Sequence, residues 1–410
     1  MAYKIAGIDV HKRVLMVVVC DVSEREWEPQ RRRFGTTTSD LHQLAAWLRE
    51  QGVQQAVMES TAQYWKPVWY ELEPYMELQL AQAFSNRAPR GRKHDFRDAE
   101  RLVRRLVAGE LILSFVPEPE QRTWRTLTRT KVQLSREVSR LQSQLECLLE
   151  EMRLKLSSLI SDLLGVSGCR ILRALAGGES DPEKLAALGD DRLHCTQKQL
   201  IEALTGTPQP MQRQLLALYL ARYDLLREQI GKLDGMIAEA MKPHEEAVVR
   251  LAAAAGFGAD SAQQVIAEVG AEAGTFPTAA HLAAWAGTCP GREESADQNH
   301  SSRSAKGNKY LRRILNQCAH AAVKKKGSHF QVVFRRLLPR LGYNGAIWAV
   351  AHRLCRLVWK ILHEKVTYQE LGCDIDPRAK RRRAQSLLRK LRSLGYHVDI
   401  RFITPEPAAA

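Results

Sequence analysis

The stretch YKIAGIDVHKRVLMVVVCD, residues 3–21, decides how the first part of the chain folds. It contains two segments rich in Val and Ile, Tyr3–Val10 and Val14–Asp21, and such segments are typical of neighbouring β-strands. Asp9 lies near the end of the first segment. A carboxylate on an apolar strand is costly to bury unless a cation or a hydrogen-bond donor compensates it, so Asp9 is the first candidate functional residue.

Strand and helix signals continue to alternate up to about residue 117. Further strands are expected over Trp27–Thr36, Gln54–Glu59 and Met76–Ala83. Helices are expected over Ser39–Glu50, with Ser39 as the N-cap, over Tyr64–Tyr75 and over Asp95–Ala108. Three strands followed by helix, strand, helix, strand and helix is the element order of a ribonuclease-H-like α/β domain. We predict that domain for residues 1–117, although other α/β folds share the order.

The next part of the chain carries two heptad seams. Leucines recur every seven residues from Leu127 to Leu148, and a second seam runs from Leu216 to Ile237. Sustained heptads predict long coiled-coil helices. We therefore expect a spacer and dimerisation arm over residues 118–244, with an inserted segment at about 160–206. The two helices would pair either as an antiparallel hairpin or between protomers.

The remaining sequence predicts a compact, mostly helical domain over residues 245–375 and a basic tail over 376–410. From Arg378 to Arg392 the tail has eight Lys and Arg residues and no acid. Such a segment is either a solvated extension or an electrostatic arm for a nucleic-acid backbone. The expected fold class is α/β plus all-α: a ribonuclease-H-like N-terminal domain, a long helical arm and a mostly helical C-terminal domain.

Composition narrows the class of partner. The 410 residues include 61 Lys and Arg against 46 Asp and Glu, a net charge of +15, which points to a polyanionic partner, most often nucleic acid. The chain opens directly into a strand-like segment, so we expect no secretory signal, and we expect no membrane-spanning helix. The eight cysteines form no Cys-x-x-Cys pair, which fits a reducing cytoplasm.

Four acidic residues stand where they would converge in the predicted fold. Asp9 and Glu59 end the first and fourth strands, which would be parallel neighbours, and Asp95 and Asp98 share one face at the start of a helix. Four carboxylates repel one another, and divalent metal relieves that repulsion. Mg²⁺ prefers a few carboxylates together with water and phosphate oxygens, and two such ions can clamp a phosphodiester during in-line displacement. The four residues therefore predict a Mg²⁺ site.

These residues also carry a family resemblance. Residues 7–12 (GIDVHK), Glu59 and Asp95-x-x-Asp98 resemble the DEDD motif of the insertion-sequence-110 family of transposases. Two later segments, Trp285–Ala296 and Lys306–Arg312, are similar to the C-terminal signature of that family. The resemblance covers roughly residues 1–117 and 245–375, and the long helices between them correspond to the family's spacer.

The resemblance implies a RuvC-like N-terminal domain of the ribonuclease-H type, and a DNA transposase or recombinase of a bacterial insertion sequence. It implies that Ser295, five residues after Pro290, is the nucleophile that attacks a DNA phosphate. It also implies a structured non-coding bridge RNA that guides target and donor recognition. The active form would be a homo-oligomer, a dimer or a tetramer, whose two sites meet across protomers. We expect it in the bacterial cytoplasm, associated with the nucleoid.

Cationic residues near Ser295 and in the tail are candidates for binding nucleic acid. A hydroxyl that attacks a phosphodiester needs positive charge close to the developing oxyanion. Four residues meet that need in sequence: Arg292, Arg303, Lys306 and Arg312. Two further groups extend the basic surface: Lys324, Lys325 and Lys326, and Arg381, Arg382 and Arg383.

Two other functions fit the residues taken alone. The first is a metal-dependent, structure-selective DNA nuclease of the junction-resolvase kind. It would use water as the nucleophile and would need the four acids but not Ser295. The second is a non-catalytic RNA- or DNA-binding scaffold, in which the acids would tolerate replacement by Asn or Gln.

Overall fold

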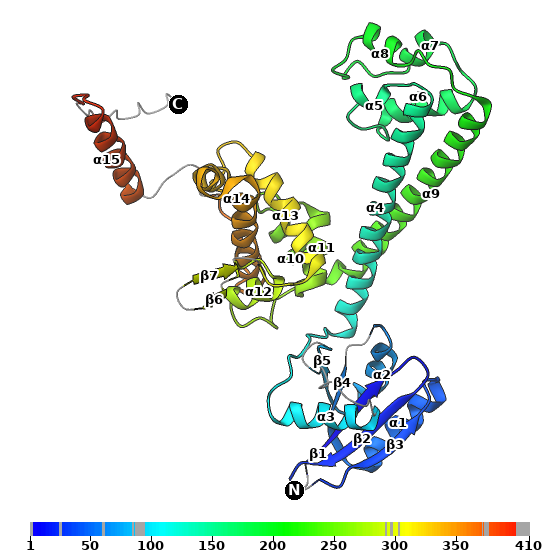
Figure 1. The fold of residues 1–410 in the computed structure, drawn as a ribbon, viewed down its shortest axis with the longest axis vertical. Coiled ribbons are helices and arrows are strands. Elements are labelled where there is room, and N and C mark those ends of the chain that lie inside the picture. The colour runs from blue at the N-terminus through cyan, green and yellow to red at the C-terminus, as the bar shows by residue number, and fades with distance from the viewer. Residues whose placement is uncertain are drawn as a thin grey trace. The chain divides into compact units, whose positions relative to one another are not determined.

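The computed structural model describes residues 3–23, 27–59, 62–83, 86, 95–291, 293–295, 298–301, 304–370, 372 and 377–398. The chain divides into two compact units, residues 1–118 and 119–410 (Figure 1). Each unit has its own hydrophobic core and is described by itself. In the parts that the structure describes, no helix is both long enough and apolar enough to cross a membrane.

The first unit is built on one five-stranded sheet. Its strands are β1 (Lys4–Val10), β2 (Leu15–Asp21), β3 (Gln30–Phe34), β4 (Val53–Glu59) and β5 (Glu77–Ala81), arranged in the order β3-β2-β1-β4-β5. The first three strands run antiparallel, whereas β4 pairs parallel with both β1 and β5. This mixed sheet confirms the predicted ribonuclease-H-like fold.

Helices cover both faces of the sheet because side chains alternate along β1. Ala6, Ile8 and Val10 pack on one face together with α1 (Thr38–Glu50) and α2 (Trp65–Leu72). Ile5 faces the other way, toward α3 (Asp95–Val107). Gly7 lies on this second face. A Cβ there would stand 2.1 Å from the carbonyl oxygen of Ala99, so α3 lies against the bare backbone of β1.

The N-cap predicted for the first helix is wrong by two residues. Thr37, not Ser39, is the N-cap of α1, because its hydroxyl accepts a hydrogen bond from the amide of Asp40 at 3.3 Å. The Asp40 carboxylate in turn accepts one from the amide of Thr37 at 3.0 Å. This reciprocal capping box needs an acid three residues after the cap, and Ser39 has His42 at that position.

The second unit begins with two long helices, α4 (Pro119–Glu151) and α9 (Pro210–Ala240), which lie side by side (Figure 1). The indole of Trp124 donates to the carbonyl of Ala240, and Arg222 pairs with Glu137 further along. The start of one helix therefore meets the end of the other, so the two form an antiparallel hairpin within the chain. Of the two pairings that the heptads allowed, the hairpin is the one observed.

A small core closes the far end of this hairpin. Leu141, Leu145 and Leu148 of α4 pack there with Leu216 and Leu220 of α9. Four short helices complete the core: α5 (Leu156–Leu159), α6 (Val166–Ala176), α7 (Pro182–Ala186) and α8 (Gln197–Ala203). The heptad leucines thus serve two contacts at once, one with the partner helix and one with the inserted segment.

The rest of the second unit is mostly helical, as expected. After a short 3-10 turn (Lys242–His244) come α10 (Glu245–Ala252), α11 (Ala259–Val269), α12 (Ala279–Ala286), α13 (Lys309–Lys324), α14 (His329–His363) and α15 (Pro377–Ser393). A hairpin of β6 (Glu293–Ser295) and β7 (Gln298–Ser301) lies between α12 and α13. Gly342, at φ 68°, interrupts the helical backbone of α14.

We predict that Gly7→Ala lowers the free energy of unfolding of the first unit by about 1–3 kcal/mol, because the new methyl group forces α3 away from β1. Hydrogen exchange of the β1 and α3 amides should accelerate accordingly. Gly231→Ala in α9 is the matched control, since nothing lies within 4 Å of the added Cβ and alanine favours a helix. Unchanged exchange in Gly7→Ala would show that the two elements are not in close contact.

Candidate functional site

Three potential metal ligands meet at one edge of the sheet in the first unit. One ligand atom from each of Asp9, His11 and Asp95 lies within 4.8 Å of the other two. Nε2 of His11 is 3.1 Å from Oδ2 of Asp9. All three residues are half-buried. Two carboxylates and an imidazole at this spacing form a donor set that suits a divalent cation.

The alternation of β1 explains this convergence. Asp9 follows Gly7 by two residues in β1, so it lies on the face that α3 covers, and His11 comes directly after the strand. Asp95 is the first residue of α3, and the close contact at Gly7 holds that helix against β1. His11 is further fixed by a turn, because its amide donates to the carbonyl of Val14 at 3.0 Å.

Glu59 and Asp98 lie in a second group next to these three. β1 and β4 are parallel and pair Ile8 with Met58, so Asp9 and Glu59 end adjacent strands. The Glu59 carboxylate accepts from Asn86 at 2.9 Å, and Asn86 accepts from Arg101 at 3.3 Å. Arg101 also pairs with Asp98 at 2.8 Å. The arginine therefore neutralises part of the charge that these two acids bring to the site.

Ser295 belongs to the second unit, where it is the last residue of β6. It pairs with Gln298 of β7 in the short antiparallel hairpin. The segment after the hairpin returns to α13 through Asn308. The Asn308 side chain caps that helix by accepting hydrogen bonds from the amides of Tyr310 and Leu311, each at 3.0 Å.

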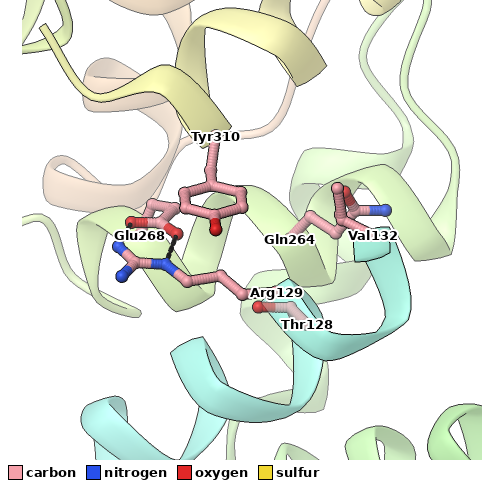
Figure 2. A pocket seen from close by; sticks show the side chains of 6 residues that line it. All are labelled: Thr128, Arg129, Val132, Gln264, Glu268 and Tyr310. Atoms are coloured by element: carbon pink, nitrogen blue, oxygen red, sulfur yellow. Dashed lines mark hydrogen bonds and ion pairs between the residues drawn. The ribbon is translucent and has the colours of Figure 1, made fainter. Parts of the chain in front are cut away.

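A buried carboxylate anchors this returning segment. Glu268 of α11 has a side chain only 2% exposed, and Asn308 donates to it at 2.6 Å. Arg129 of α4 donates two hydrogen bonds of 2.8 Å to the same carboxylate (Figure 2). Nε of Arg125 lies 3.5 Å from the carboxylate as well. Glu268 thus joins the start of α4 to the segment that follows the hairpin of β6 and β7, here called the serine hairpin because it carries Ser295.

Both arginines remain charged in this arrangement. Burial lowers the pKa of Arg125 to about 10, against the opposing effect of Glu268, which still leaves it protonated at neutral pH. Burial also acts to lower the pKa of Arg129, but its hydrogen bonds to Glu268 together with the charge of that carboxylate and of Tyr310 outweigh this, and the net pKa is raised. The cavity among Arg129, Glu268 and Tyr310 has a volume of about 10 Å³, room for one water molecule at most, so this is a structural joint (Figure 2).

The residues predicted to bind nucleic acid differ in their exposure to solvent. Lys306 is exposed just before Asn308, and Lys324, Lys325 and Lys326 are exposed at the end of α13. Arg312 instead points inward: it donates to the carbonyl of Gly287, and its guanidinium carbon lies 4.5 Å from the ring centroid of Trp348. Arg381, Arg382 and Arg383 lie in α15. Arg292 and Arg303 lie outside the described residues.

Comparison with known protein families identifies the chain. Residues 249–334 match the model described as Transposase IS116/IS110/IS902 family. Residues 6–153 match a second transposase model, that of the DEDD transposases of the IS110 type. The first match contains the DEDD residues and the second contains the C-terminal signature, which is the order of these motifs in the sequence. The chain belongs to the IS110 family of transposases. A search of curated proteins found no match.

Membership of the IS110 family establishes the general activity. The chain is a DNA transposase, and DNA is its partner. The DEDD domain of the family implies a divalent metal, and the group of Asp9, His11 and Asp95 is a donor set that fits one.

The sequence reasoning missed three residues of this region. His11 belongs to the GIDVHK motif and comes directly after β1, two residues from Asp9, which is the only sequence signal for its place beside that acid. Glu268 stands in the apolar last part of α11, between Ala267 and Val269, where an acid is unusual. Arg101 gave no signal, because one arginine on a helix rich in charge is ordinary.

We expect Glu268→Gln to destabilise the second unit by about 3–5 kcal/mol, because it leaves the buried guanidinium of Arg125 and the partly buried one of Arg129 without their counter-charge. Unfolding by urea, followed through tryptophan fluorescence, measures the change. Glu228→Gln is the control, because that carboxylate is 60% exposed and pairs only with Lys232 across one helical turn. Equal effects of the two substitutions would contradict the role given to Glu268.

Proposed function

We propose that this transposase cuts and rejoins DNA with Ser295 as its nucleophile, and that Asp9, Glu59, Asp95 and Asp98 hold Mg²⁺ for the reaction. The observation that carries the proposal is the convergence of Asp9 and Asp95 at the sheet edge where Glu59 also ends its strand. Acids gathered in this way suit an ion that works on phosphate oxygens.

In each step of the proposed chemistry, one phosphoryl group passes from one oxygen to another. The Ser295 hydroxyl gives up its proton to a base, and its oxygen attacks a DNA phosphorus atom. The bond from phosphorus to one DNA oxygen breaks, and that oxygen leaves as a hydroxyl once protonated. A phosphoserine link then joins protein and DNA and conserves the bond energy, so a DNA hydroxyl can attack it and reseal the strand. Bound Mg²⁺ supplies charge that stabilises the phosphate oxygens.

The residues around the acids set their positions. Asn86 and Arg101 tie Glu59 to Asp98, which holds the end of β4 and the first turn of α3 in register. The positive charge of Arg101 lowers the repulsion among the four carboxylates. In the second unit, the link from Glu268 to Asn308 fixes the segment just after the serine hairpin, so that Ser295 is carried on an anchored loop.

We also propose that a structured bridge RNA guides the choice of donor and target DNA, and that the active form is a homo-oligomer, a dimer or tetramer working at the bacterial nucleoid. A net charge of +15 and the basic helix α15 supply the electrostatic attraction that an RNA backbone needs. The acids and the serine belong to different units, which allows an acid site of one protomer to work with the serine of another.

Ser295→Ala should abolish the covalent protein–DNA adduct. Cells that carry the gene within its native flanking DNA are lysed in denaturant, the DNA is digested, and mass spectrometry looks for a peptide with a nucleotide linked to Ser295. Ser304→Ala, an exposed residue nearby, is the control and should keep the adduct. Recombination by Ser295→Ala at the normal rate would favour the nuclease that uses water.

A guide RNA should copurify with the protein. Sequencing of the RNA bound to the purified chain is expected to find one discrete transcript encoded in DNA next to the gene. Protein whose net charge alone attracts RNA would instead bring down a broad sample of cellular transcripts, and that result would count against RNA guidance.

A further inference from the structure

We propose that His11 is a protein ligand of the metal in the first unit, and that its imidazole makes this site favour Mn²⁺ over Mg²⁺. The inference rests on the metal site proposed above and deepens it, because it names a fifth residue and the class of ion that the site prefers.

The position of His11 is built into the fold. It follows Asp9 by two residues, directly after β1 ends at Val10, and the bond from its amide to Val14 closes the turn to β2. Its Nε2 lies 3.1 Å from an oxygen of Asp9, and the ligand atom of Asp95 is within 4.8 Å of both. The His11 side chain is 32% exposed and that of Asp9 is 15% exposed, so an ion and its remaining water ligands can enter.

The donor set decides which ion is preferred. Mg²⁺ takes oxygen ligands and keeps much of its water, so an imidazole gives it little. First-row transition ions such as Mn²⁺ accept imidazole nitrogen together with carboxylate oxygen. A site of two carboxylates and one imidazole therefore raises the affinity for Mn²⁺ more than that for Mg²⁺.

The rival role for His11 is a hydrogen bond that orients the Asp9 carboxylate without touching the ion. The two roles differ in one observable. A nitrogen bound to Mn²⁺ gives a ¹⁴N coupling in the pulsed electron paramagnetic resonance spectrum of the ion, and a nitrogen that only contacts Asp9 does not give the coupling of a direct ligand.

The experiment uses the full chain, treated with nuclease and freed of metal by a chelator, then titrated with Mn²⁺ or Mg²⁺. The wild type is expected to bind Mn²⁺ with a directly coordinated ¹⁴N. His11→Asn should lose that coupling and bind Mn²⁺ about tenfold more weakly or worse, with Mg²⁺ binding changed less than about threefold. His42→Asn is the control, since that imidazole is 64% exposed and pairs with Glu71 of the same unit.

Each other outcome overturns a stated claim. Mn²⁺ that binds the wild type without the nitrogen coupling, and is lost in Asp9→Asn, leaves the metal site standing and removes His11 from it. Failure of the wild type to bind either ion, or binding unchanged by Asp9→Asn, removes the metal site itself. The wild-type spectrum needs no substitution, so a variant that fails to fold does not decide the question.

Discussion

The candidate metal site of the first unit depends on one close contact, that of the Gly7 backbone with the Ala99 carbonyl. A side chain at position 7 would occupy the space where α3 lies, at 2.1 Å from that oxygen. The contact brings the start of α3 to the end of β1, and Asp95 thereby reaches Asp9 and His11. The acids come from segments far apart in the sequence, so their geometry is only as firm as this contact between helix and strand. A glycine inside a strand, which by itself weakens that strand, is the condition for the site.

In the second unit, segments far apart in the sequence are held together by a buried charge and not by a close backbone contact. The buried carboxylate of Glu268 is held by two arginines of α4 and by Asn308, which begins α13. Removing a charge of this kind from water is costly, and the surrounding bonds offset that cost only while all of them are made. The long arm, α11 and the segment that follows the serine hairpin are therefore tied to a common point. A displacement of the arm would reach that segment through Arg129 and Glu268.

The sequence predicted the N-terminal fold well because strand segments rich in Val and Ile and the apolar faces of the helices are local signals. The strands were found within a few residues, and the element order indicated the correct sheet. Ser39 was the wrong N-cap, because the deciding feature was the acid three residues after Thr37. For the site, motif spacing picked out Asp9 and Asp95, which the structure brings together, whereas the bridge through Asn86 and Arg101 depends on tertiary contacts that no spacing reveals. The only sequence signal for His11 is its place directly after β1, two residues from Asp9, and that for Glu268 is its place between two apolar residues near the end of α11.

We propose that the acids of the first unit and the serine of the second serve one recombination reaction. The most direct test is made in cells that carry the gene in its native flanking DNA, with amplification of the junction formed when the element is excised as a circle. Wild type, Asp9→Ala and Ser295→Ala are compared at matched protein levels. Both substitutions are expected to abolish the junction. A junction that persists in Ser295→Ala but disappears in Asp9→Ala would show that the chemistry needs the acids alone, and would contradict the proposal.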